Sequence, residues 1–129
     1  MINPVGEIKG EAITIVNSTN TAVSVQSGSL PVYGTPCMIA LMEKATCSAA
    51  SSLLEEDETT VGTNIDVSHI KASGIGTVIK ATALLSDIDG RKLTFSVVAK
   101  EKNGDTVGIG TIERFVVSSD RFMKKVGAK

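Results

Sequence analysis

In one segment of the chain, residues 35–54, the apolar positions would spread around most of a helix's circumference rather than along a single stripe. Thr35 is a good helix N-cap and Pro36 is the favoured first helical residue, so we predict a helix over 35–54. A helix that is apolar around most of its circumference should be covered on most sides. Glu43 nevertheless follows the apolar run 37–42, although carboxylates are rarely buried without a partner.

The remaining apolar positions alternate with polar ones and predict strands. We expect one strand before the helix and four after it, over 7–16, 60–72, 77–87, 91–100 and 106–117. The turns between the later strands are Ser-Gly-Ile-Gly at 73–76, Asp-Gly at 89–90 and Asn-Gly at 103–104. Because Asp-Gly and Asn-Gly favour tight hairpins, the four later strands should form an antiparallel meander. Residues 17–33 are predicted to be a loop with a short strand or turn at 22–25, and 119–126 a short helix or an extended tail.

These elements predict an α+β protein in which one long central helix is wrapped by an antiparallel sheet of about five strands. A length of 129 residues suits a single domain over 1–129. Although 42% of the residues are hydrophobic, no run approaches the roughly 18 apolar residues of a membrane span. The N-terminus shows no signal-peptide pattern, so we predict a cytoplasmic protein without a membrane partner.

Charge and cysteine content narrow the classes of function. The net charge is −1 and aromatic residues make up 3%, which argues against a nucleic-acid partner. Cys37 and Cys47 would lie about 15 Å apart on the helix, too far for a disulfide, and two cysteines alone do not suggest a zinc site. A surplus of aliphatic surface in so small a domain favours self-association.

His69 is the only histidine, and it lies on the predicted strand 60–72. Alternate residues of that strand, from Val61 to His69, form a mostly apolar face, so the imidazole should point toward the helix. We therefore expect Glu43 and His69 to be hydrogen-bond partners. Taken singly, each residue has a simpler interpretation, since Glu43 could be solvated and His69 could be an ordinary core residue.

Thr35 has two interpretations as well. Its hydroxyl could cap the helix, or it could join the first-turn N–H groups in stabilising developing negative charge. Thr35 and Glu43 lie eight positions apart, about 12 Å along one helix. A site that uses both residues needs either a loop that folds back or two subunits, and we favour two subunits.

The spacing of five residues resembles that of a known family. The pattern consists of Thr35, Glu43, Gly62, His69 and Arg114, together with the stretches TVGTNIDVSHIKASGIGTVIKATA, DGRKLTFSV and GIGTIERFVV. Between about Thr35 and Phe122 the chain resembles the hotdog-fold acyl-CoA thioesterases, specifically the branch of the bacterial fluoroacetyl-CoA thioesterase.

This resemblance implies a hotdog fold, an acyl-CoA substrate, and a homodimer, with dimer or tetramer left open. It implies catalytic roles for Thr35, Glu43 and His69 at the dimer interface. It also implies substrate contacts from Gly62 and Arg114, and from Gly74 and Gly76 beside the pantetheine arm. Neither a metal nor a cofactor other than the CoA of the substrate is expected.

The chain departs from the family where the fluoroacetyl enzyme has pocket-gating phenylalanines. Residues 26–29 here are Gln-Ser-Gly-Ser, so we expect a short-chain acyl thioester without fluoroacetyl specificity. The pattern leaves open whether Glu43 attacks directly or activates water. Candidate cations for the CoA phosphates are Lys71, Lys80, Arg91 and Lys92.

Two other classes of function are compatible with the same residues. One is a non-catalytic protein that binds CoA or an acyl thioester. The other is a hotdog hydratase or dehydratase that uses Asp66 and His69, which ranks lower because residues three apart on a strand face opposite sides.

Overall fold

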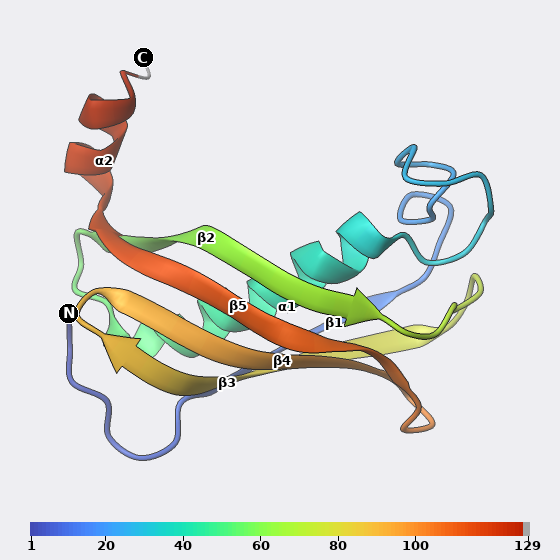
Figure 1. Ribbon diagram of the computed structural model, residues 1–129, viewed down its shortest axis with the longest axis horizontal. Coiled ribbons are helices and arrows are strands. Elements are labelled where there is room, and N and C mark those ends of the chain that lie inside the picture. Colours follow the sequence, from blue (N-terminus) through green and yellow to red (C-terminus); the bar gives the residue numbers. More distant parts are fainter. Residues whose placement is uncertain (128–129) are drawn as a thin grey trace.

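A single long helix lies against a curved, five-stranded antiparallel sheet in the computed structural model, which describes residues 1–127 (Figure 1). The helices are α1 (Thr35–Ala50), extended by the 3-10 turn η1 (Ser51–Leu53), and α2 (Ser119–Val126). The strands are β1 (Lys9–Ile15), β2 (Glu58–His69), β3 (Val78–Asp89), β4 (Lys92–Glu101) and β5 (Thr106–Ser118). The predicted α+β architecture is thereby confirmed.

The strand order is β1-β3-β4-β5-β2, and every neighbouring pair is antiparallel. The meander β3-β4-β5 matches the prediction, with Gly90 and Gly104 at positive φ in its two turns. The predicted hairpin between β2 and β3 is wrong, because β2 pairs with β5 at one edge while β3 pairs with β1 and β4. Backbone hydrogen bonds join the 73–76 segment instead to Val16 and Tyr33, and Gly74 forms an isolated bridge with Val32.

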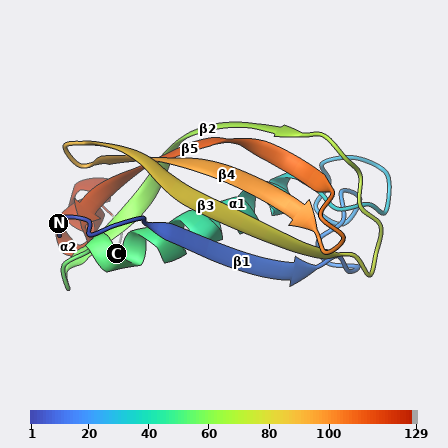
Figure 2. The same ribbon diagram turned by 90° about the horizontal axis from the view of Figure 1, so that it is seen from below.

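Helix α1 packs on the inner face of the sheet, closest to β1 and β3 (Figure 2). A Cβ on Gly10 of β1 would overlap the backbone of Ala45 and Ala49, so the glycine permits this close approach. The core is formed by apolar side chains of the helix and of the inner sheet face, chiefly Met38, Met42, Ala45, Leu53, Ile79, Leu93, Phe95, Val97, Val107, Ile112 and Val116.

The opposite face of α1 is less covered than the sequence suggested. Ala40, Lys44, Cys47 and Ser48 are exposed, and both cysteines are free, as expected. None of the helices within residues 1–127 is long and apolar enough to span a bilayer.

A bulge in β2 decides which of its residues face the helix. The register with β5 shifts between Gly62 and Asn64, so an extra residue is inserted into β2. Gly62 lies opposite Arg114 and His69 opposite Gly108. Seven positions would normally put Gly62 and His69 on opposite faces, but the extra residue returns both to the inner face. The predicted inward face is therefore correct near His69 and wrong at Val61.

Candidate active site

Thr35 and His69 are brought together although they lie far apart in the sequence. The Oγ1 atom of Thr35 is 2.7 Å from Nδ1 of His69. The N-cap of α1 is Gly34, not Thr35 as predicted, and no side chain caps this end. Because the backbone enters the helix one residue earlier, the threonine hydroxyl is free to face the imidazole.

The imidazole of His69 lies in a partly buried, mostly apolar setting. The ring of Tyr33 meets it edge-on at a centroid distance of 6.3 Å. Burial lowers the pKa of His69, although the Lys71 backbone opposes the shift. Nε2 is buried and has no hydrogen-bond partner among the described residues. A neutral imidazole with an unpartnered buried nitrogen can exchange a proton with a bound molecule.

A cavity of about 300 Å³ opens beside the Thr35–His69 pair. Its walls come from the loop before α1 and from the segment after β2, and they include Ala22, Ser27, Val32, Tyr33, Ile70, Lys71 and Ala72. Polar and apolar groups share this lining about equally. The cavity therefore offers a small space of mixed polarity directly next to a hydroxyl and an imidazole.

Glu43 belongs to a second group of residues further along the helix. Its Oε2 accepts a hydrogen bond from Nη1 of Arg114 at 3.1 Å. The Arg114 side chain is almost wholly buried, and its other donors bind Oγ1 of Thr60 at 2.8 Å and the Thr60 carbonyl at 3.1 Å. The Glu43 side chain is 37% exposed. The guanidinium thus holds a carboxylate that still reaches solvent.

Gly62 makes room for this ion pair. A Cβ built on Gly62 would lie 2.7 Å from Oε2 of Glu43 and 3.3 Å from Nη1 of Arg114. Any larger residue would displace the carboxylate, so the glycine keeps one side of Glu43 open. Glu43, Gly62 and Arg114, all three singled out from the sequence, therefore form one cluster.

The expected hydrogen bond between Glu43 and His69 does not form within the described part of one chain. Glu43 pairs with Arg114, and His69 pairs with Thr35. Helix α1 and strand β2 run in opposite directions, so Thr35 meets the end of β2 and Glu43 meets its middle. Eight helical residues separate the two groups by about 12 Å. The prediction failed because Glu43 and His69 both face inward but lie at different positions along the axis of α1.

The remaining predicted substrate residues lie at the surface. Gly74 and Gly76 are exposed in the 70–77 connection, and Gly76 has a φ of 97°. All four candidate cations are engaged with carboxylates: Lys71 with Glu101 and Asp105, Lys80 with Glu11, Arg91 with Glu58, and Lys92 with Glu113 at 3.9 Å.

Sequence reasoning missed three supporting residues. Thr60 binds Arg114, Tyr33 packs on the imidazole, and Glu101 pairs with Lys71. The position of Thr60, two residues before Gly62 on the same face, was a usable signal. The contact between Glu101 and Lys71 depends on strand pairing, and no local pattern indicates it.

Comparisons with known proteins point in one direction. A family model described as fluoroacetyl-CoA-specific thioesterase matches residues 16–120. The fluoroacetyl-CoA thioesterase of Streptantibioticus cattleyicolor is 38% identical over 98 residues, covering 76% of this chain and 70% of that protein.

Solved structures agree with the sequence comparison. A fluoroacetyl-CoA thioesterase structure is 30% identical, with a TM-score of 0.88 over 97% of this chain and 96% of that one. A hot-dog-like protein from Thermanaerovibrio acidaminovorans, 23% identical, has a TM-score of 0.84 over 94% of this chain and 89% of that chain, and is similar in fold. The architecture is thus the hotdog fold.

Proposed function

This chain belongs to the fluoroacetyl-CoA-specific thioesterase family, and we propose that it hydrolyses a short acyl-CoA with Thr35, Glu43 and His69. The chain is a thioester hydrolase of the hotdog fold. The reaction adds water across the thioester bond and releases a carboxylic acid and the CoA thiol. The 2.7 Å contact between Thr35 and His69, beside a small cavity, carries the assignment of the site.

Each residue has a defined part in the proposed reaction. The Glu43 carboxylate, held by Arg114, either attacks the thioester carbonyl or takes a proton from the attacking water. The Thr35 hydroxyl and the first-turn N–H groups of α1 bind the oxygen on which negative charge develops. His69 is neutral near pH 7 because burial lowers its pKa. If Glu43 takes the proton of the attacking water, His69 passes that proton to the departing thiolate. If Glu43 attacks, the thiolate leaves first, water then cleaves the acyl–glutamate anhydride, and His69 passes the proton of that water to the thiolate.

We place the complete site between two copies of the chain. A two-fold axis that sets the α1 helices antiparallel would bring Thr35 and His69 of one copy toward Glu43 of the other. Such an arrangement closes the distance of about 12 Å that separates the two groups within one helix. It also gives Glu43 a proton-transfer partner.

Three surface features support this dimer. Strand β2 lies at an edge of the sheet, and Ile65 on its inner face is 39% exposed. The uncovered face of α1 presents the small side chains of Ala40, Cys47 and Ser48, together with the longer Lys44. Glu43 lies beside these surfaces and is only half-buried. A partner on this side would cover apolar surface and desolvate the carboxylate.

A short acyl group suits the cavity beside His69. Its volume of about 300 Å³ is at the lower end for ligand sites and also has to hold the thioester. Ser27 and the rings of Tyr33 and His69 line it. The small volume therefore favours short acyl chains.

The test is thiol release from a series of acyl-CoAs of increasing chain length, followed with a thiol-reactive dye. We expect turnover of the short members and its loss in Glu43→Gln, a near-isosteric change that removes the charge. The matched control is Glu113→Gln, which removes a carboxylate from β5 beside Arg114, on the opposite face of the sheet. Binding of acyl-CoA without thiol release would favour a non-catalytic binding protein, and activity of Glu43→Gln within tenfold of wild type would remove Glu43 from the mechanism.

A further inference from the structure

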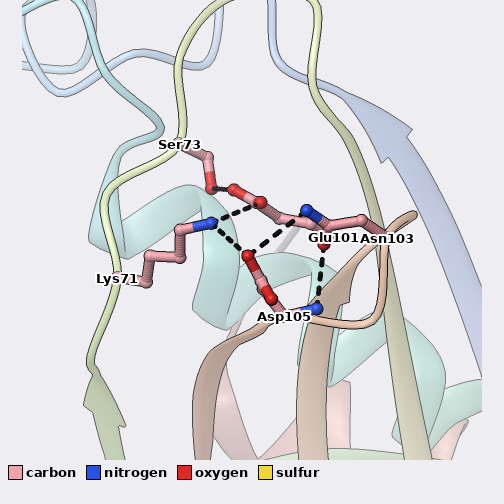
Figure 3. Close-up of polar contacts among 5 residues, drawn as sticks. All are labelled: Lys71, Ser73, Glu101, Asn103 and Asp105. Carbon is pink, nitrogen blue, oxygen red and sulfur yellow. Dashed lines mark hydrogen bonds and ion pairs between the residues drawn. The ribbon is translucent and has the colours of Figure 1, made fainter.

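The connection between β2 and β3, residues 70–77, starts directly after His69. Side-chain hydrogen bonds and ion pairs join it to the β4–β5 hairpin (Figure 3). Nζ of Lys71 donates to Oε1 of Glu101 and to Oδ2 of Asp105, each at 2.7 Å. The other oxygen of the Glu101 carboxylate, Oε2, accepts from Oγ of Ser73 at 2.7 Å. Both carboxylate oxygens of Glu101 therefore hold the same short segment, two and four residues beyond the histidine.

Ser73 continues the chain of contacts to the other half of the pair. Its carbonyl accepts from the backbone N–H of Tyr33 at 2.8 Å, two residues before Thr35. Gly74 forms an isolated bridge with Val32. The tyrosine ring packs on the imidazole of His69. One segment thus touches the backbone that carries Thr35 as well as the strand end that carries His69.

Glu101 and Asp105 differ in how far their side chains are buried. The Glu101 side chain is 10% exposed and Ser73 is 2% exposed, so their hydrogen bond is shielded from water. The hydrogen bonds from Lys71 and then Ser73 lower the pKa of Glu101 and keep it charged. Asp105 is 54% exposed and binds Lys71, whereas the Ser73 hydroxyl donates to Glu101. The shielded carboxylate is therefore the one that binds both Lys71 and Ser73.

From these contacts we propose that Glu101 is a positioning residue, which holds Thr35 and His69 at hydrogen-bond distance through Lys71 and Ser73. The catalytic part of this statement rests on the proposed thioesterase site. The geometric part does not, because it concerns the contact between Thr35 and His69 and can be followed on the His69 ring without any substrate. Loss of the Glu101 carboxylate would free the 70–77 connection, leave the buried Ser73 hydroxyl without its acceptor and loosen the strand end.

The single histidine makes the geometric part measurable without substrate. We would titrate the His69 imidazole by NMR in wild type, Glu101→Ala, Glu101→Gln and Ser73→Ala. Removing a negative charge by itself would lower the pKa of His69. Loosening of the site would admit water and move the pKa upward, toward the ordinary histidine value. The two effects have opposite signs, so an upward shift is the mark of lost positioning.

The expected result is an upward shift in Glu101→Ala, a smaller one in Ser73→Ala, and the least in Glu101→Gln, whose amide oxygen still accepts from Ser73. In acyl-CoA hydrolysis, Glu101→Ala should lose about tenfold or more in kcat with little change in KM, as expected when reacting groups are misplaced. Glu113→Gln, with the same change of charge, is the control and should change neither reading.

An unchanged or lowered His69 pKa in both Glu101→Ala and Ser73→Ala would overturn the positioning role. Ser73→Ala removes one oxygen atom and keeps the proposal testable if Glu101→Ala does not fold. If the wild-type chain cleaves no acyl-CoA, the proposed function fails while the NMR titration still decides whether Glu101 positions the ring.

Discussion

The hydroxyl of Thr35 lies 2.7 Å from Nδ1 of His69 across 34 positions of the sequence, and it caps no helix. This contact joins the first turn of α1 to the last residue of β2. Since Gly34 takes the cap position, the threonine contributes its hydroxyl to the site without a role at the helix end. Activity and stability should therefore separate at this residue.

Thr35→Ala should lower kcat by about a hundredfold, in the range seen when one oxyanion donor is removed. The unfolding free energy in urea should change by less than the ~1 kcal/mol that a true N-cap costs. Thr35→Ser, which keeps the hydroxyl, is the control and should retain most of the activity. A large loss of stability in Thr35→Ala would show that the residue supports the helix end instead.

Gly62→Ala should reduce kcat strongly while the protein stays folded. The added methyl group would lie 2.7 Å from the Glu43 carboxylate, the mobile end of a flexible side chain, so the carboxylate moves before the backbone does. Thr59→Ala, at an exposed position of the same strand, is the matched control. Steady-state kinetics and a thermal melt distinguish the two effects, and full activity in Gly62→Ala would show that the position of Glu43 is unimportant.

Arg114 and Glu43 should differ in their effect on stability although they form one ion pair. Arg114→Met leaves the Thr60 carbonyl and hydroxyl without their donors in a buried place, and we expect a loss of about 2–4 kcal/mol in urea unfolding. Glu43→Gln touches a carboxylate that is 37% exposed, so its loss should stay below about 1 kcal/mol. Equal losses of unfolding free energy in Arg114→Met and Glu43→Gln would contradict the prediction that Arg114 contributes more to stability than Glu43.

The buried imidazole should make stability depend on pH. Because the pKa of His69 is lower in the folded protein, the unfolded chain binds more protons between the folded and the unfolded pKa values. Stability therefore rises with pH through this window and is lost as the pH falls below the unfolded value. His69→Gln should flatten this part of the urea-unfolding profile. A profile that stays equally steep in His69→Gln would assign the dependence to other groups.

The elements of this fold could be predicted from the sequence, but part of their pairing could not. Asp89-Gly90 and Asn103-Gly104 correctly indicated two hairpins, because each turn has a local chemical signature. The turn at 73–76 looked equally local, yet β2 pairs with β5 across the sheet. Pairing between distant strands depends on the packed sheet and leaves no short motif.

Only some contacts of the candidate site could be predicted from the sequence. Thr35, Glu43 and His69 were chosen for their chemistry and their spacing, and Thr35 does lie beside His69. The partner of Glu43 was assigned to His69, whereas the chain supplies Arg114. The pairing with His69 failed because His69 meets Thr35, which lies about 12 Å from Glu43 along α1. The bulge beside Gly62 had a separate effect, since it reversed which side chains face inward near Val61.

The central claim is that each active site combines Glu43 of one protomer with Thr35 and His69 of another. The direct measurement mixes two inactive variants, Glu43→Gln and His69→Ala, unfolds them in urea, refolds them together, and follows thiol release from a short acyl-CoA. With equal amounts, half of the dimers pair the two variants, and in each of these one site carries both changes and the other carries none.

About a quarter of the wild-type activity should then return. Each variant refolded alone should remain inactive. The contradicting result is a mixture that stays inactive although the refolded wild type is active and labelled subunits are seen to exchange. Every site would then take its residues from one chain.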